Sequence, residues 1–131
     1  MTLQMLDPNR LNDWKRRVLT LMDELAGWGT AAGWSVQRTE KRLNEQRVGE
    51  YMLPALHMRT PDGELYVTPV ALDVMGADGR VDVEAWPSLN RVRLIGVGTP
   101  PSWLIMTDSN VPLRQPWNSQ TFVELVKDLQ K

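Results

Sequence analysis

The feature that most constrains this chain is the shortness of the turns between its extended segments. Apolar and polar residues alternate with a period of two through much of the stretch from residue 34 to residue 107, which is typical of half-buried strands. The intervening turns at 60–64, 76–79 and 86–90 span only a few residues. A parallel pair needs a crossover of about a dozen residues or more, so neighbouring segments should pair antiparallel. The sequence therefore predicts a meander sheet of five or six strands.

A helix is expected on each side of these strands. Apolar residues recur at alternating spacings of three and four from Leu11 to Trp28, which places them in one stripe of an amphipathic helix. Asp7 can cap the free amides of the first turn, and Pro8 suits the first helical position. A last helix should follow Asn118, a favourable cap. The predicted fold is α+β, with the C-terminal helix packed on the antiparallel sheet.

Two strand segments leave questions open. Residues 38–47 are heavily charged and fit either the tip of a long solvated hairpin or a short helix. The strand expected at 50–59 contains Pro54, which has no N–H to donate to a ladder. This strand should therefore lie near an edge of the sheet or carry a bulge. The next strand is expected over residues 65–75, and a two-residue loop within 76–79 should lead directly to the strand at 80–86.

Length and composition restrict the class of protein. The chain has 131 residues without a repeat or linker, so we expect one domain over residues 1–131. It has no cysteine, which excludes disulfides, thiolate metal sites and cysteine nucleophiles and favours a reducing compartment. No signal-peptide pattern and no apolar run of about 18 residues occurs, so we expect a cytoplasmic protein without a membrane span. A net charge of −1 argues against a dedicated nucleic-acid binder.

The strongest cluster of candidate functional residues is acidic. The turn at 76–79 would place Asp73 opposite Asp82 or Glu84, depending on the loop residues, with all three on one sheet face. Facing carboxylates repel, so a divalent cation, a raised pKa or a basic neighbour must compensate. Arg91 and Arg93 have the same parity on the following strand. Cross-strand ion pairs, and hence a structural role, are favoured over a metal site.

Three further residues are candidates for a functional surface. His57 is the only histidine, but the sequence places no nucleophile or orienting acid beside it, so no catalytic role is assigned. Trp103 and Trp117 flank an irregular segment that contains prolines, and exposed rings there would mark a partner surface.

Two other motifs receive structural interpretations. The basic residues 15–17 lie on the polar face of the first helix and should be solvated. The stretch 96–98 resembles the start of a phosphate-binding loop, but Pro100 and Pro101 follow where a helix N-terminus is required.

These observations lead to a small non-catalytic binding or adaptor domain as the expected function. Its partner would be another protein or a second copy of the chain in a homodimer. One alternative is a metal-dependent hydrolase or nuclease-like protein that uses Asp73, Asp82 and Glu84. The other is a small-ligand carrier with an apolar pocket between the sheet and the helices. No catalytic residue, metal ligand or cofactor is assigned, and neither a membrane nor a nucleic acid is an expected partner.

Overall fold

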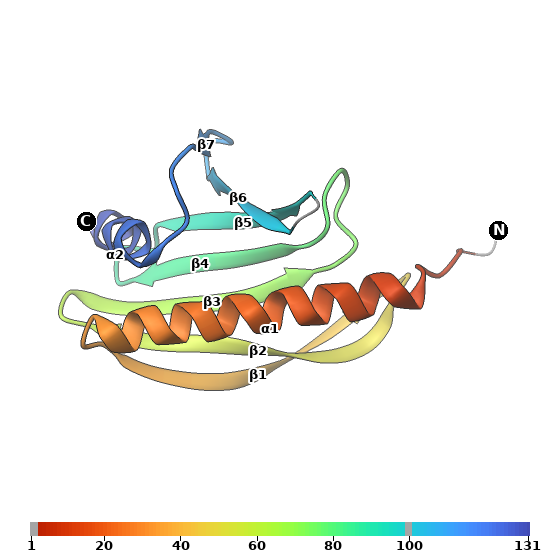
Figure 1. Ribbon diagram of the computed structural model, residues 1–131, viewed down its shortest axis with the longest axis horizontal. Coiled ribbons are helices and arrows are strands. Elements are labelled where there is room, and N and C mark those ends of the chain that lie inside the picture. Colours follow the sequence, from red (N-terminus) through yellow and green to blue (C-terminus); the bar gives the residue numbers. More distant parts are fainter. Residues whose placement is uncertain (1–2, 99–100) are drawn as a thin grey trace.

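The computed structural model describes residues 3–98 and 101–131 as a helix, an antiparallel sheet and a second helix (Figure 1). The elements are α1 (Pro8–Ala31), β1 (Ser35–Glu45), β2 (Gly49–Thr60), β3 (Gly63–Ala71), β4 (Arg80–Trp86), β5 (Arg91–Val97), β6 (Ser102–Thr107), β7 (Pro112–Leu113) and α2 (Ser119–Leu129). The strands lie in sequence order, and all neighbours pair antiparallel. This confirms the α+β meander. The sheet has seven strands rather than five or six, because β7 pairs with β6 in a stretch that had been expected to be irregular.

Both helices cover the same face of the sheet. Helix α1 runs along the length of the sheet over β1 and β2. Helix α2 packs beside the C-terminal end of α1 and against β4 (Figure 1). The helices meet where the rings of Trp28 and Phe122 lie 5.9 Å apart. The predicted stripe of α1 supplies its side of the core, and the alternate residues of the central strands supply the other side. The buried members of the stripe are Trp14, Val18, Leu21 and Leu25, and Met22 beside them is buried as well.

Both ends of α1 follow local sequence rules, because Asp7 caps its start and Gly33, with φ +85°, follows its last turn. Asp7 caps the helix, since its side chain accepts a hydrogen bond of 2.9 Å from the amide of Asn9, and Pro8 takes the first position. Gly29 lies inside the helix, which continues to Ala31. It is buried against Met58, and a Cβ there would crowd the Met58 sulfur. No helix among the described residues is long and apolar enough to span a membrane.

The β1–β2 hairpin answers the two questions left open by the sequence, which concerned residues 38–47 and Pro54. Residues 38–45 belong to β1, and the hairpin closes with Glu45 opposite Gly49, so the charged stretch is strand and tip rather than helix. Pro54 pairs with Glu40 of β1, whereas the ladder between β2 and β3 reaches only as far as Leu56. On the β3 side, Pro54 therefore has no ladder partner, and the expectation of an edge position is confirmed there.

The connection between β3 and β4 differs from the predicted tight turn. Strand β3 ends at Ala71 and β4 begins at Arg80, so residues 72–79 lie outside the ladder. The amides of Leu72 and Asp73 donate to the carboxylate of Glu45 at 2.9–3.1 Å. These bonds attach the chain to the tip of the β1–β2 hairpin instead of to β4. Glu45 lies far away in the sequence, so turn rules could not reveal this contact.

Candidate functional site

The acidic residues predicted to share a sheet face are only partly brought together. Asp82 and Glu84 lie on the face away from the helices, opposite uncharged residues of β3. Asp73 lies in the 72–79 connection, and its carboxylate contacts Arg47 at 3.3 Å. The prediction that Asp73 faces Asp82 or Glu84 is wrong, because β3 ends two residues before Asp73.

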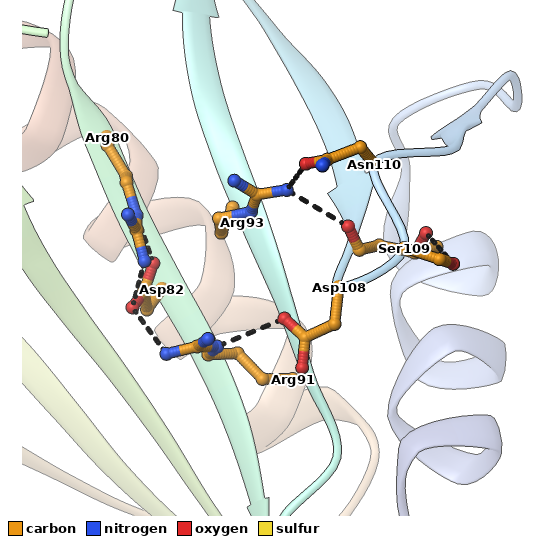
Figure 2. A network of polar contacts seen from close by, with 8 residues as sticks. Arg80, Asp82, Arg91, Arg93, Asp108, Ser109 and Asn110 are labelled. Atoms are coloured by element: carbon orange, nitrogen blue, oxygen red, sulfur yellow. Dashed lines mark hydrogen bonds and ion pairs between the residues drawn. The ribbon is translucent and has the colours of Figure 1, made fainter.

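Arginines compensate Asp82, as Figure 2 shows, whereas Glu84 forms no ion pair among the described residues. In the β4–β5 ladder Asp82 lies opposite Arg93, and Glu84 lies opposite Arg91, so the predicted parity is confirmed. The ion pairs do not follow this register, however, because one joins Arg80 and Asp82 along β4 itself and the other runs diagonally from Arg91 to Asp82. Arg80 donates two hydrogen bonds to Asp82, at 2.8 and 3.0 Å, and Arg91 approaches Asp82 at 3.6 Å. The carboxylate of Asp82 is thereby held from two sides.

The other arginine binds the turn after β6 (Figure 2). Arg93 donates to the carbonyl oxygen of Thr107 at 3.1 Å and to the side chain of Asn110. Arg91 also contacts Asp108 at 3.3 Å. Across residues 3–98 and 101–131, no three histidine, aspartate or glutamate side chains are grouped to hold a metal ion. The geometry that the metal-dependent hydrolase hypothesis required is therefore not formed.

His57 has an acidic neighbour that the sequence analysis missed. Its Nε2 lies 2.9 Å from the Glu64 carboxylate, and its ring stacks on Tyr66 with a centroid distance of 4.4 Å and an interplanar angle of 5°. Glu64 is on the adjacent strand, which hid the pair from a search along the chain. Within the described residues, Glu64 is the only hydrogen-bond partner of the His57 side chain, so no hydroxyl nucleophile is positioned by it.

A cleft of about 1010 Å³ opens along one flank of α1. The helix contributes one wall, in which residues 10, 13, 17, 20 and 24 recur at alternating spacings of three and four, beside the buried stripe. The start of β6 and the segment that leads to α2 form much of the opposite wall. The lining residues are Arg10, Asp13, Trp14, Arg16, Arg17, Thr20, Glu24, Leu72, Asp78, Gly98, Pro101, Ser102, Trp103, Gln115 and Trp117.

Tryptophan rings line both halves of the cleft. Trp103 packs edge-on against Trp14, with ring centroids 6.2 Å apart. Trp117 packs against Trp28 at 5.5 Å and Phe122 at 6.1 Å. The two tryptophans singled out from the sequence therefore line one cleft, and both are half-buried rather than freely exposed.

Arg17 departs from the solvated state expected for residues 15–17. Lys15 and Arg16 are exposed, but the Arg17 guanidinium lies over the Trp103 ring, 5.8 Å from its centroid. Its Nη2 donates to the carbonyl oxygen of Gly98 at 3.2 Å. Gly96 leaves room for the guanidinium, because a Cβ there would collide with Nη1. The 96–98 stretch thus accommodates an arginine rather than starting a phosphate-binding loop.

The cleft contains buried donors without acceptors and an acid that is partly desolvated. Arg17 Nη1 and Trp117 Nε1 are buried and have no hydrogen-bond partner among the described residues. Burial raises the pKa of Glu24, which lies further along the same helix wall. The available sequence signal for Arg17 was its position beside the apolar stripe, three residues after Trp14.

No protein-family model, curated protein or solved structure matches this chain. Its function therefore has to be inferred from its own side chains and their arrangement. Of the places described above, the cleft beside α1 is the one where several candidate residues from distant parts of the chain meet around an open volume.

Proposed function

We propose that this protein is a non-catalytic binding domain that holds a small organic ligand in the cleft beside α1. The observation that carries this proposal is a volume of about 1010 Å³ whose lining includes Trp103, Trp117 and the deeply buried Trp14. Ligand sites are typically concave, with volumes of about 300–1,000 Å³, and combine apolar or aromatic walls with a few polar groups. A second hollow near Trp34 and Lys127 has only about 230 Å³.

The polar groups elsewhere support binding rather than catalysis. Asp82 is engaged by arginines, and His57 is engaged by Glu64. A catalytic set needs a nucleophile, a base and an orienting group in mutual contact. The carrier function, one of the alternatives considered from the sequence, fits this distribution of contacts best.

The uncharged dye N-phenyl-1-naphthylamine, whose fluorescence rises in apolar surroundings, tests this function. We expect saturable binding with one dye per chain. The variant Trp103→Leu should bind the dye several-fold more weakly, because it loses an aromatic wall of the cleft. Trp86→Leu is the matched control, since Trp86 lies outside the cleft and is 46% exposed. An absence of saturable binding, or equal affinities for Trp103→Leu and the wild type, would contradict the proposal.

A second candidate is self-association through the sheet face opposite the helices. Tyr66 and Trp86 are 36% and 46% exposed, respectively, on strands of this face. The face also carries Arg91 and Glu84, so it bears charges of both signs and can complement a second copy of itself about a two-fold axis. Sedimentation velocity over a hundredfold concentration range should show a dimer that Trp86→Glu dissociates. A monomer at every concentration would exclude this candidate.

A further inference from the structure

The cleft has an excess of hydrogen-bond donors. Three buried side-chain polar atoms lack a partner among the described residues, and all three are nitrogens that donate. Two of them, Arg17 Nη1 and Trp117 Nε1, belong to residues that line the cleft. Buried donors normally find an acceptor in the protein, in water or in a ligand. A ligand that complements these walls should therefore bring acceptor oxygens.

The charges at the Arg17 end of the cleft also favour a ligand with acceptor oxygens. In the part of the chain that the structure describes, neither Arg10 nor Arg17 forms an ion pair, whereas the carboxylate of Asp13 contacts Arg16 at 3.7 Å. Glu24 stands two helical turns beyond Arg17, about 10 Å along the axis. Asp78 is another acidic residue on the walls, and it is exposed to solvent. Arg17 is thus a partly desolvated cation without a carboxylate partner.

The Arg17 guanidinium is packed between the ring of Trp103 and the backbone at Gly96. The ring lies over the guanidinium, and Nη1 itself has almost no surface exposed to solvent. An acceptor can bind Nη1 if the guanidinium turns from Gly96 towards the cleft, and a flat apolar body can then lie against Trp103. A molecule that joins an acidic group to an aromatic or apolar body satisfies both requirements.

We propose that the ligand of the cleft is an organic anion whose acidic oxygens bind Arg17 while its apolar body lies against Trp103. This inference rests on the proposed ligand-binding function and adds the chemical class of the ligand. Carboxylate, sulfonate and phosphate share the required chemistry, which is a charged acceptor with several lone pairs.

Two dyes that differ by one group provide the test. The probe 8-anilinonaphthalene-1-sulfonate is N-phenyl-1-naphthylamine with a sulfonate added. The wild type should bind the sulfonate about tenfold or more tightly than the uncharged dye at low salt, because charge-assisted hydrogen bonds are strong when desolvated. Added salt should weaken binding of the sulfonate and leave the uncharged dye unaffected. Equal affinities of the wild type for the two dyes would overturn the anion assignment while leaving ligand binding intact. If neither dye binds, the proposed function itself fails.

Variants assign the preference to Arg17. Arg17→Met should reduce the ratio of the two affinities to about one, and Arg17→Lys should restore part of it, because lysine keeps the charge but not the planar fork. Lys15→Met is the matched control, since it removes the same charge from an exposed position on α1 outside the cleft. Far-UV circular dichroism checks that each variant is folded. An unchanged affinity ratio in folded Arg17→Met would overturn the proposal, as would an equal loss in Lys15→Met.

Discussion

The two carboxylates of β4 differ in their contacts with neighbouring side chains. Asp82 accepts two hydrogen bonds from Arg80 and contacts Arg91, and its side chain is only 17% exposed. Glu84 accepts one hydrogen bond, of 3.0 Å, from the indole of Trp86. Both residues have the same parity on the strand, so the alternation pattern alone could not distinguish them.

This difference predicts unequal effects of neutralising the two acids. Asp82→Asn should lower the free energy of unfolding by about 1–3 kcal/mol, because it weakens charge-assisted bonds and leaves two arginines facing each other. Glu84→Gln should change it by less than about 0.5 kcal/mol. Urea denaturation of both variants measures these values. A similar loss in both would mean that the Arg80–Asp82–Arg91 contacts do not stabilise the fold.

The raised pKa of Glu24 should make the stability of the fold depend on pH. Burial raises its pKa, so between the unfolded and folded pKa values the folded protein binds more protons than the unfolded chain. Stability from this group is present below the unfolded pKa and is lost as the pH rises through the folded pKa. Glu24→Gln should therefore melt at a higher temperature than the wild type at about pH 7, with the gain shrinking towards about pH 4.

The control for this prediction is Glu50→Gln, which alters an exposed glutamate. Its melting temperature should follow that of the wild type at both pH values. A gain in Glu24→Gln that persists unchanged at low pH would show that ionisation of Glu24 is not its source.

At the scale of elements, α1 is held by the stripe that faces the sheet. Leu21 is fully buried in this stripe, whereas Leu19, two residues earlier on the same helix, is 49% exposed. Leu21→Ala should lower the free energy of unfolding by about 2–5 kcal/mol through lost burial and a residual cavity. Leu19→Ala should cost less than about 1 kcal/mol. Comparable losses in guanidinium denaturation would mean that α1 is not packed as described.

The end of the 72–79 connection depends on a glycine. Gly79 has φ +109°, and a Cβ at this position would overlap the ring of Trp14. Gly79→Ala should therefore destabilise the protein by more than 1 kcal/mol, through backbone strain and steric overlap. Asp62→Ala is the control, because it leaves Pro61 and Gly63 of the β2–β3 turn unchanged. Similar melting temperatures for the two variants would contradict this account.

At the scale of the whole molecule, one hydrophobic core lies between the sheet and the two helices. Its buried residues come from both helices, from β1 to β6 and from Leu72 in the 72–79 connection. We therefore expect one cooperative unfolding transition, with superimposable curves from far-UV circular dichroism and tryptophan fluorescence. The expectation of a single domain over residues 1–131 would be wrong if α2 unfolded in a separate transition.

The elements that could be predicted were those governed by neighbours in the chain. The stripe of α1, its Asp7 cap and the Asn118 cap of α2 all follow from residues within one or two turns. The 72–79 connection was mispredicted because Glu45 binds its amides across the fold. Strand β7 was missed because two residues carry too little alternation to indicate a strand.

In the candidate sites, too, local patterns predicted some features and missed others. The parity of Asp82, Glu84, Arg91 and Arg93 followed from strand alternation, but the choice of Arg80 as the closest partner of Asp82 did not. A long arginine side chain can extend along its own strand, as Arg80 does, or diagonally to the next strand, as Arg91 does, and strand alternation does not specify that direction.

The sequence by itself determined the order and type of the helices, the antiparallel meander and the buried stripe of α1, because periodicity, turn length and capping act over a few residues. Only the tertiary structure decided that Arg17, Trp103 and Trp117 line one cleft. Their meeting depends on how α1 lies across the sheet and how the chain returns from β6 to α2. The packing of distant elements determines the position of α1 and the path from β6 to α2. No pattern among neighbouring residues predicts that packing.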